Sequence, residues 1–507
     1  VRLYRPFPAA ALRAALPATA TRIAVLDRTK EPGAPAEPLH LDVMSAFTGE
    51  SETLVIGGRY GLGSKEFTPA DAKAVFDELA RPEPRPRFTV GIVDDVTHLS
   101  LETGDFRVPT TAVQAMFYGL GSDGTVGANK TSIKLIGEHT DQYAQGYFVY
   151  DSKKSGSMTV SHLRFGPDPI RSAYLIDDAD FVACHQFGLL ARVDVLAHAR
   201  AGATVLLNSP YDAASVWQHL PADARAHIVR KHLSVHVVDA TTIARDAGLG
   251  PRINTVMQPC FFALADVLPV DRAIELVKAG VVKAYGHRGP EVVERNMTAI
   301  DAALAGLQEV EVPAGALDDA ADVADSDLSV VQTLIAGLGD SLPVSAMRVD
   351  GTYETGTSVL EKRQLAEEIP IWDPSICIDC GKCTIVCPHA AIRMKAYSPD
   401  ALDGAPDGFL SKPYSGKELG EGRLLTIQVA PDDCTGCGIC VAVCPVRDKQ
   451  NPDHKAIDMA PADEHRDVER PRYEHFLEIP DVDRTLVRRE TVKGSQLLRP
   501  LFEFSGA

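Results

Sequence analysis

Eight of the ten cysteines lie in two runs with the same spacing. In each run two residues lie between the first and second cysteines and between the second and third, and a fourth cysteine follows after three intervening residues, directly before a proline. The runs are Cys377, Cys380, Cys383 and Cys387, then Cys434, Cys437, Cys440 and Cys444. Thiolates at this spacing bind [4Fe–4S] clusters, and the fourth cysteine of each run ligates the other run's cluster. The spacing therefore predicts one cluster on Cys377, Cys380, Cys383 and Cys444, and another on Cys434, Cys437, Cys440 and Cys387.

Other uses of these cysteines fit the spacing less well. A structural zinc site is complete with two pairs of ligands, so it needs neither the third close cysteine nor the proline. A disulfide framework is typical of small secreted domains, whereas this chain has 507 residues. The two remaining cysteines, Cys184 and Cys260, stand alone in apolar stretches and are expected to be buried core thiols. The cysteine pattern thus indicates an electron carrier.

Composition limits the remaining possibilities. A chain of 507 residues has room for three or four domains of about 100–200 residues. No apolar run reaches the roughly 18 residues that a membrane span needs. The net charge of −18 disfavours nucleic acid as a partner. Because cluster thiols need a reducing compartment, we expect a cytoplasmic protein.

The two ends of the chain are unusual. The sequence begins at Val1 without a methionine and finishes at Ala507 in an apolar stretch. Chain ends are normally exposed, and exposure favours polar residues. We therefore expect an internal piece of a larger protein, with a processed or misassigned gene as the alternative.

The elements before the cysteine runs are predicted to form α/β structure. Short buried strands are expected at 21–27 and 53–58, and a helix over 68–79 begins with Thr68 as its cap. The proline-spaced segment 81–87 is expected to be a linker. Beyond it, strands are expected at 88–93, 112–118, 146–150, 174–176, 203–207 and 233–238, and helices at 271–278 and 290–307. This alternation predicts a doubly wound α/β domain with a largely parallel sheet.

A glycine-rich loop follows one of these strands. Residues 119–124 match G-x-G-x-x-G, and a helix is expected over 125–136. Such a turn lets backbone approach a phosphate and directs helix N-terminal amides at it, although it can also simply close a strand–helix connection. Lys153 and Lys154 stand where an NAD site carries an acidic residue, which favours a ligand with an extra phosphate, such as coenzyme A or NADP. The alternative for these lysines is a solvated turn.

Several longer motifs resemble the pyruvate:ferredoxin (flavodoxin) oxidoreductase family. They are residues 118–130, 143–147, 150–156, 161–166 and 208–210, together with 1–6, 25–33 and 491–507 near the ends. The resemblance implies an enzyme that decarboxylates pyruvate oxidatively on thiamine diphosphate, forms acetyl-coenzyme A, and passes electrons through three [4Fe–4S] clusters to ferredoxin or flavodoxin. In that family the pyruvate site, thiamine diphosphate, magnesium and third cluster belong to regions that this sequence lacks. The resemblance thus assigns no catalytic residue to this chain, and implies that it is inactive alone and that the complete enzyme is a homodimer.

The resemblance also implies a domain order and a coenzyme A site. The expected units are a transketolase-C-terminal-like part (1–87), a coenzyme A-binding domain (88–309), a small linking domain (310–366), a ferredoxin-like domain with an insertion at about 396–423 (367–490), and the start of the thiamine domain (491–507). The implied coenzyme A residues are Gly121, Ser122, Asp123, Gly124, Thr125, Lys153, Asn254 and Asn296. The alternative for the two asparagines is a helix-capping or surface role.

Two other functions remain possible at the level of the sequence. One is a self-standing electron-transfer subunit of the polyferredoxin type, fused to a nucleotide-binding module. The other is an NADP-linked oxidoreductase, which fits the glycine loop but leaves the family motifs unexplained.

Overall fold

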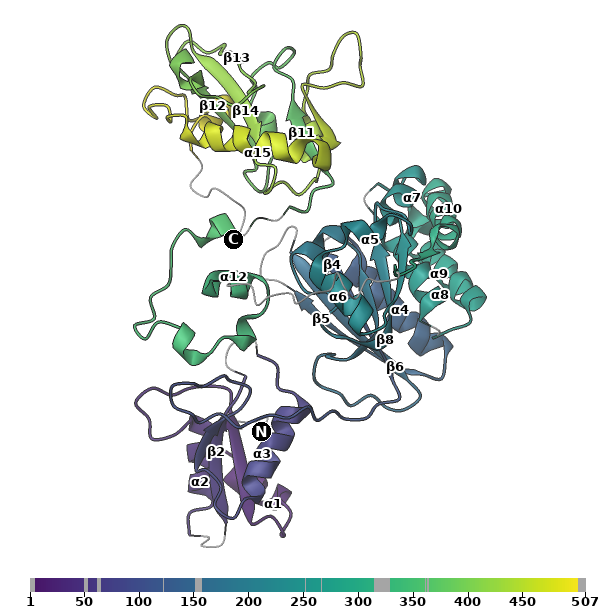
Figure 1. Cartoon of the computed structure of the whole chain (residues 1–507), viewed down its shortest axis with the longest axis vertical. Coiled ribbons are helices and arrows are strands. Elements are labelled where there is room, and N and C mark those ends of the chain that lie inside the picture. Colours follow the sequence, from purple (N-terminus) through teal and green to yellow (C-terminus); the bar gives the residue numbers. More distant parts are fainter. Residues whose placement is uncertain are drawn as a thin grey trace.

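The computed structural model describes residues 5–49, 53–61, 65–121, 123–150, 157–250, 252–265, 267–313, 329–360, 362 and 364–499. Figure 1 shows an N-terminal unit, a central α/β unit and a C-terminal unit as separate bodies along the chain. Within the described residues, no helix is long and apolar enough to cross a membrane.

The N-terminal unit is a small parallel sheet with three helices. Its strands, in sheet order, are β1 (Arg22–Asp27), β2 (Leu54–Arg59) and β3 (Arg87–Thr89). Its helices are α1 (Ala9–Ala15), α2 (Pro38–Ala46) and α3 (Pro69–Ala80). Thr68 caps α3 as expected, because its hydroxyl accepts from the Asp71 N–H at 3.2 Å while the Asp71 carboxylate accepts from the Thr68 N–H at 2.7 Å.

The strand expected at 88–93 does not join the central sheet. It is the short β3, which pairs in parallel with β2. Phe88 is 1% exposed and packs with Ile56 and Val75, so its burial draws this segment into the N-terminal core.

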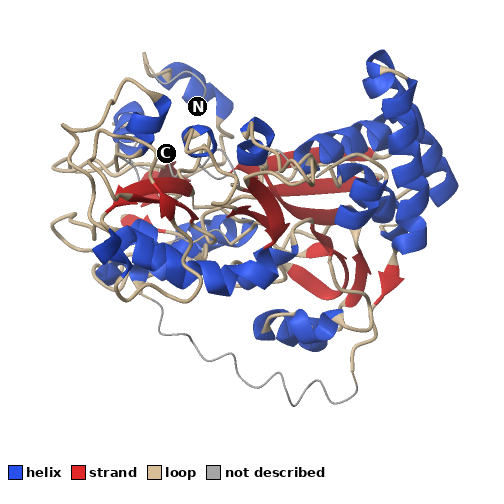
Figure 2. Cartoon of the chain, turned by 90° about the horizontal axis from the view of Figure 1, so that it is seen from above, coloured by secondary structure: helices blue, strands red, loops and turns tan. Residues whose placement is uncertain are grey.

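The central unit is a seven-stranded mixed sheet in the order β10-β9-β8-β7-β4-β6-β5. The strands are β4 (Val113–Leu120), β5 (Tyr143–Tyr150), β6 (Met158–Gly166), β7 (Ala179–Cys184), β8 (Ala199–Asn208), β9 (Ser234–Val238) and β10 (Gln308–Glu309). The helices are α4 (Thr125–His139), α5 (Val216–His219), α6 (Ala222–Arg230), α7 (Ala240–Asp246), α8 (Asn254–Leu264), α9 (Val270–Tyr285) and α10 (Pro290–Gly306). Figure 2 shows the sheet between its helical layers.

Alternate residues of the strands feed two separate hydrophobic cores. On β4, Phe117 packs with Phe261 of α8 on one face, whereas Met116 and Tyr118 pack on the other face in a core that includes Ile228 of α6. Covered on both faces, the sheet has the doubly wound arrangement that the sequence predicts.

Two expectations about this sheet were wrong. It is not largely parallel, because only β9, β8, β7 and β4 run parallel, while β6, β5 and β10 pair antiparallel. No strand forms at 174–176, and the chain instead enters the sheet at β7.

The segment after the central unit packs back on the N-terminal unit. It contains α12 (Val330–Ile335) and short turns. The Val344 N–H donates to the Val93 carbonyl at 2.9 Å, and the Ser345 N–H donates to the Asp95 carboxylate at 3.0 Å.

The C-terminal unit contains two antiparallel sheets, β11–β15 and β12–β14–β13. Its strands are β11 (Glu368–Trp372), β12 (Ile392–Tyr397), β13 (Lys412–Pro413), β14 (Leu424–Val429) and β15 (Ile457–Pro461). Its helices are α13 (Lys382–Ile385), α14 (Ile439–Val443), α15 (Ala462–Glu478) and α16 (Val492–Gln496). The insertion between the two cysteine runs thus supplies β13, the edge strand of one sheet.

Candidate functional site

The two cysteine loops fold in the same way. Each ends in a short helix, α13 or α14, whose N-terminal cap is a left-handed glycine, Gly381 at φ 70° or Gly438 at φ 68°. Two residues earlier, Asp379 (φ 57°) and Gly436 (φ 68°) are also left-handed. These residues turn the backbone where most L-residues would be strained, so each loop curls around its own cysteines.

The cysteines line two cavities, in the grouping that the spacing predicts. The first cavity is lined by Cys377, Cys380, Cys383 and Cys444. The second cavity is lined by Cys387, Cys434, Cys437 and Cys440. The fourth cysteine of each run therefore lies with the three close cysteines of the other run.

Both cavities have features that suit a bound iron–sulfur cluster. Backbone N–H groups point at thiol sulfurs: Asp379 at Cys377 Sγ (3.5 Å) and Gly436 at Cys434 Sγ (3.4 Å). Such N–H···S bonds stabilise thiolate ligands.

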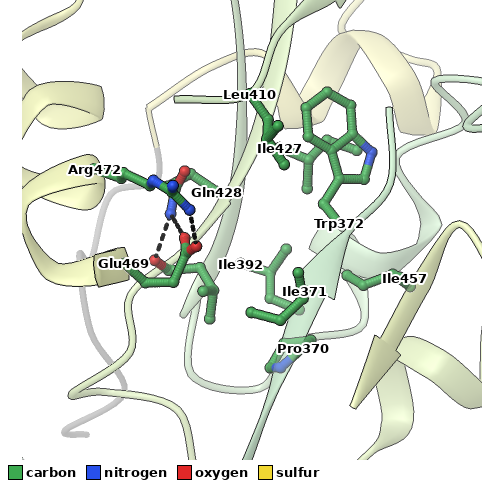
Figure 3. A pocket seen from close by; sticks show the side chains of 11 residues that line it. Pro370, Ile371, Trp372, Ile392, Leu410, Ile427, Gln428, Ile457, Glu469 and Arg472 are labelled. Atoms are coloured by element: carbon green, nitrogen blue, oxygen red, sulfur yellow. Dashed lines mark hydrogen bonds and ion pairs between the residues drawn. The ribbon is translucent and has the colours of Figure 1, made fainter. Parts of the chain in front are cut away.

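A group of mostly apolar side chains, drawn in Figure 3, contributes to the walls of both cavities. Its side chains come from the strands β11, β12, β14 and β15. Trp372, Ile427 and Ile457 also line the first cavity. Pro370 and Ile392 also line the second cavity. Aliphatic and aromatic side chains thus lie beside both cavities.

Helix α15 closes one side of this core through a buried carboxylate (Figure 3). Glu469 accepts hydrogen bonds from Gln428 Nε2 at 2.5 Å and from Arg472 Nη1 at 2.6 Å. A buried charge is tolerated when it is paired and hydrogen-bonded in this way, so α15 is fixed onto β14.

The glycine-rich loop lies at the carboxyl end of β4, in the parallel part of the central sheet. The two oxygens of the Asp123 carboxylate accept from the N–H groups of Leu120 and Thr125, each at 2.7 Å. Gly124, at φ 93°, caps α4, and a Cβ on it would stand 2.8 Å from Asn254 Oδ1. The structure thus brings together Gly121, Asp123, Gly124, Thr125 and Asn254, whereas Ser122 and Lys153 lie outside the described residues.

Asn296 is beside this group, but its side chain is engaged internally. Its Oδ1 accepts from the Thr255 hydroxyl at 3.0 Å, and its Nδ2 donates to the Val292 carbonyl at 2.7 Å. With 4% exposure, Asn296 joins α10 to the start of α8.

Comparisons with known proteins match both regions. Residues 114–306 match the family described as pyruvate ferredoxin/flavodoxin oxidoreductase, and residues 376–447 match the 4Fe–4S dicluster domain. Residues 328–366 match a domain of unknown function. The pyruvate-flavodoxin oxidoreductase of Nostoc sp. is 51% identical over 100% of this chain, which covers 45% of that protein. Residues 114–306 thus match the pyruvate ferredoxin/flavodoxin oxidoreductase family, and the whole chain aligns with part of such enzymes.

Other relatives give the same result. The pyruvate:ferredoxin oxidoreductase of Moorella thermoacetica and the probable pyruvate-flavodoxin oxidoreductase of Escherichia coli are each 49% identical over 100% of this chain. The chain spans about 44% of the length of both. Among solved structures, a pyruvate oxidoreductase subunit of Thermotoga maritima matches 40% of this chain and 100% of its own, with 18% identity and a TM-score of 0.33.

These matches confirm the resemblance found in the sequence. They also confirm the fold class, an α/β domain followed by a ferredoxin-like domain for iron–sulfur clusters. All eight cysteines of the two runs fall inside the dicluster match.

Several thiols of the two cysteine runs are strongly shielded from water. Burial, with the charges of neighbouring cysteines, raises the pKa of Cys383 to about 12. Burial likewise raises the pKa of Cys440 to about 11, a shift that the Val441 N–H opposes. Because metals bind thiolates, loading these sites with iron must release protons.

Sequence reasoning missed one buried residue at the glycine-rich loop. His185 follows β7 directly, and its Nδ1 is 2.7 Å from the Thr125 hydroxyl. Burial lowers the pKa of His185 to about 4, so the ring is neutral at pH 7. The neutral ring is hydrogen-bonded to Thr125 at the end of the glycine-rich loop. Its position just after the buried strand could have identified it. Cys184 and Cys260, by contrast, are buried core thiols as expected.

Proposed function

We propose that this chain is the coenzyme A-binding and electron-relay part of a pyruvate:ferredoxin or pyruvate-flavodoxin oxidoreductase. The observation that carries the proposal is the pair of four-cysteine cavities beside one apolar core, in a chain that aligns with these enzymes over its whole length.

The eight cysteines would ligate two [4Fe–4S] clusters, one in each cavity. When bound, such clusters accept and release single electrons. The N–H groups of Asp379 and Gly436 would stabilise the ligating sulfurs, as their distances to Cys377 and Cys434 suggest. The shared apolar core would exclude water between the two sites.

The glycine loop would bind the phosphates of coenzyme A. The N-terminus of α4 and the glycines of the loop suit a phosphate, and Lys153 would add a charge-assisted contact. Both oxygens of Asp123 are already bonded to loop amides, so Asp123 would shape the loop rather than contact the ligand. Asn254 would help to position Gly124, and Asn296 would hold the start of α8.

The complete enzyme would supply the remaining chemistry. We place the pyruvate site, thiamine diphosphate, magnesium and a third [4Fe–4S] cluster in the other domains, and propose a cytoplasmic homodimer that passes electrons to ferredoxin or flavodoxin. This chain alone should therefore leave pyruvate unchanged.

Anaerobic reconstitution tests the relay. The chain should take up about eight iron and eight sulfide, since each cluster holds four of each. It should then accept electrons from dithionite and reduce ferredoxin or flavodoxin. Release of labelled carbon dioxide from pyruvate, above a no-protein control, would contradict the proposed division of labour.

Calorimetry tests the ligand. Coenzyme A should bind, and Lys153→Ala should weaken binding about tenfold or more, because a hydrogen bond to a charged group contributes about 1.5–3 kcal/mol. The matched control is Lys154→Ala, which should bind coenzyme A with nearly unchanged affinity. Equal binding of NADPH, unaffected by Lys153→Ala, would favour an NADP-linked enzyme instead.

A further inference from the structure

The first cysteine loop contains a buried carboxylate that the second loop lacks. Asp379 is 1% exposed and lies between two cysteines of the first cavity in the sequence. The equivalent residue of the second loop is Gly436, which makes the same left-handed turn and the same N–H···S contact. The turn therefore does not need a carboxylate, and glycine would adopt it with less strain.

Two lysines from distant segments meet this carboxylate. Lys412 Nζ, from β13, is 3.0 Å from Asp379 Oδ1 and also donates to the Cys377 carbonyl. Lys493 Nζ, from α16, is 3.8 Å from Asp379 Oδ2. The Ser415 N–H donates to the same oxygen at 3.3 Å. The loop thus carries one buried negative charge and two partly buried positive charges.

Neighbouring side chains hold Lys493, the more distant of the two lysines, in place. Lys493 Nζ donates to the Ser415 hydroxyl at 2.8 Å and stands 4.3 Å from the centre of the Tyr414 ring. A Cβ on Gly381 would stand 3.5 Å from the Lys493 Cα, so α16 packs directly on the cysteine loop.

These charges lie beside a ligand sulfur. The Asp379 N–H is 3.5 Å from Cys377 Sγ, and Lys412 Nζ donates to the Cys377 carbonyl. Charges in a low-dielectric interior are weakly screened, so they act on any charge added to the first cavity.

We propose that Asp379, Lys412 and Lys493 set the reduction potential of the cluster in the first cavity, with Asp379 as a positioning residue. The inference rests on the proposed relay function, in which one electron adds one negative charge to that cluster. The Asp379 carboxylate opposes this charge and the lysines favour it. Because Lys493 belongs to α16, the reduction potential of the first cluster depends on the position of α16.

Redox titration of the reconstituted full chain, followed by electron paramagnetic resonance, tests the proposal. Asp379→Asn should raise the potential of the first cluster, and Lys412→Met should lower it. Each should change the ratio of reduced to oxidised cluster about tenfold at a fixed applied potential, which corresponds to about 59 mV for one electron. The double variant should return close to the parent value, and the second cluster should not shift.

Two further variants separate charge from geometry and from folding. Asp379→Gly introduces the residue of the second loop, so it should match Asp379→Asn if charge is the cause. Lys493→Met should lower the potential even if the Asp379 variants lose their cluster. Shifts of Asp379→Asn and Lys412→Met in the same direction, or unchanged potentials with full iron content, would overturn the proposal. A parent chain that takes up no iron would instead refute the relay itself.

Discussion

Gly124→Ala offers the sharpest test of how the glycine loop is built. Gly124 has φ 93°, and left-handed backbone costs an L-residue about 1–2 kcal/mol. The new Cβ would also stand 2.8 Å from Asn254 Oδ1, which is closer than such atoms approach, so Asn254 must move. We expect a total cost of about 2 kcal/mol or more in the local stability of β4 and α4.

Amide hydrogen exchange measures this cost in the intact chain, where unfolding of several units would blur a single transition. Protection in β4 and α4 should fall, whereas protection in β12 and β14 should not change. Coenzyme A affinity should fall about tenfold for each 1.4 kcal/mol needed to restore the loop.

Gly127→Ala is the matched control. Gly127 lies three residues further on in α4, and a Cβ there would meet nothing within 4 Å. Replacing a helical glycine by alanine should stabilise α4 by about 0.5–1 kcal/mol. Equal effects of the two variants would refute the assignment of a special conformation to Gly124.

Three further predictions concern other parts of the chain. Cys387→Ala should remove the spectroscopic signal of the cluster in the second cavity and spare that of the first, and the reverse result would overturn the ligand assignment. A hydrogen bond to Asp373, aided by Asp458, raises the pKa of His454 above 6.5. The contribution of protonated His454 to the stability of the fold is therefore complete below pH 6.5 and is lost as the pH rises through the raised pKa of the folded state. His454→Asn should abolish this pH dependence of stability in hydrogen-exchange measurements on β15. Thr68→Ala should destabilise α3 by about 1 kcal/mol, and Thr68→Ser should not.

Local patterns in the sequence were sufficient for much of the site. The cysteine spacing implied which sulfurs share a cavity, and the glycine loop was correctly placed between a strand and a helix. The short segment around Phe88 was assigned to the wrong sheet because its pairing depends on which distant core buries that ring.

Strand β6 shows a second reason why sequence reasoning failed. Its buried positions include His162 and Arg164. These polar residues interrupt the run of apolar residues from which a buried strand is predicted. Their partners come from other segments: the Ile176 N–H donates to His162 Nδ1 at 3.2 Å, and Arg164 Nε donates to Gln114 Oε1 at 3.1 Å. The contacts of Lys412 and Lys493 with Asp379 were missed for the same reason, because both lysines are distant from Asp379 in the sequence.

The grouping of the cysteines has a consequence for how the protein matures in the cell. Cys444 follows α14 and Cys387 follows α13, yet each lines the cavity formed mainly by the other run. Neither set of four cysteines is therefore complete until residue 444 has been synthesised, so neither cavity can form fully during synthesis of the first run alone.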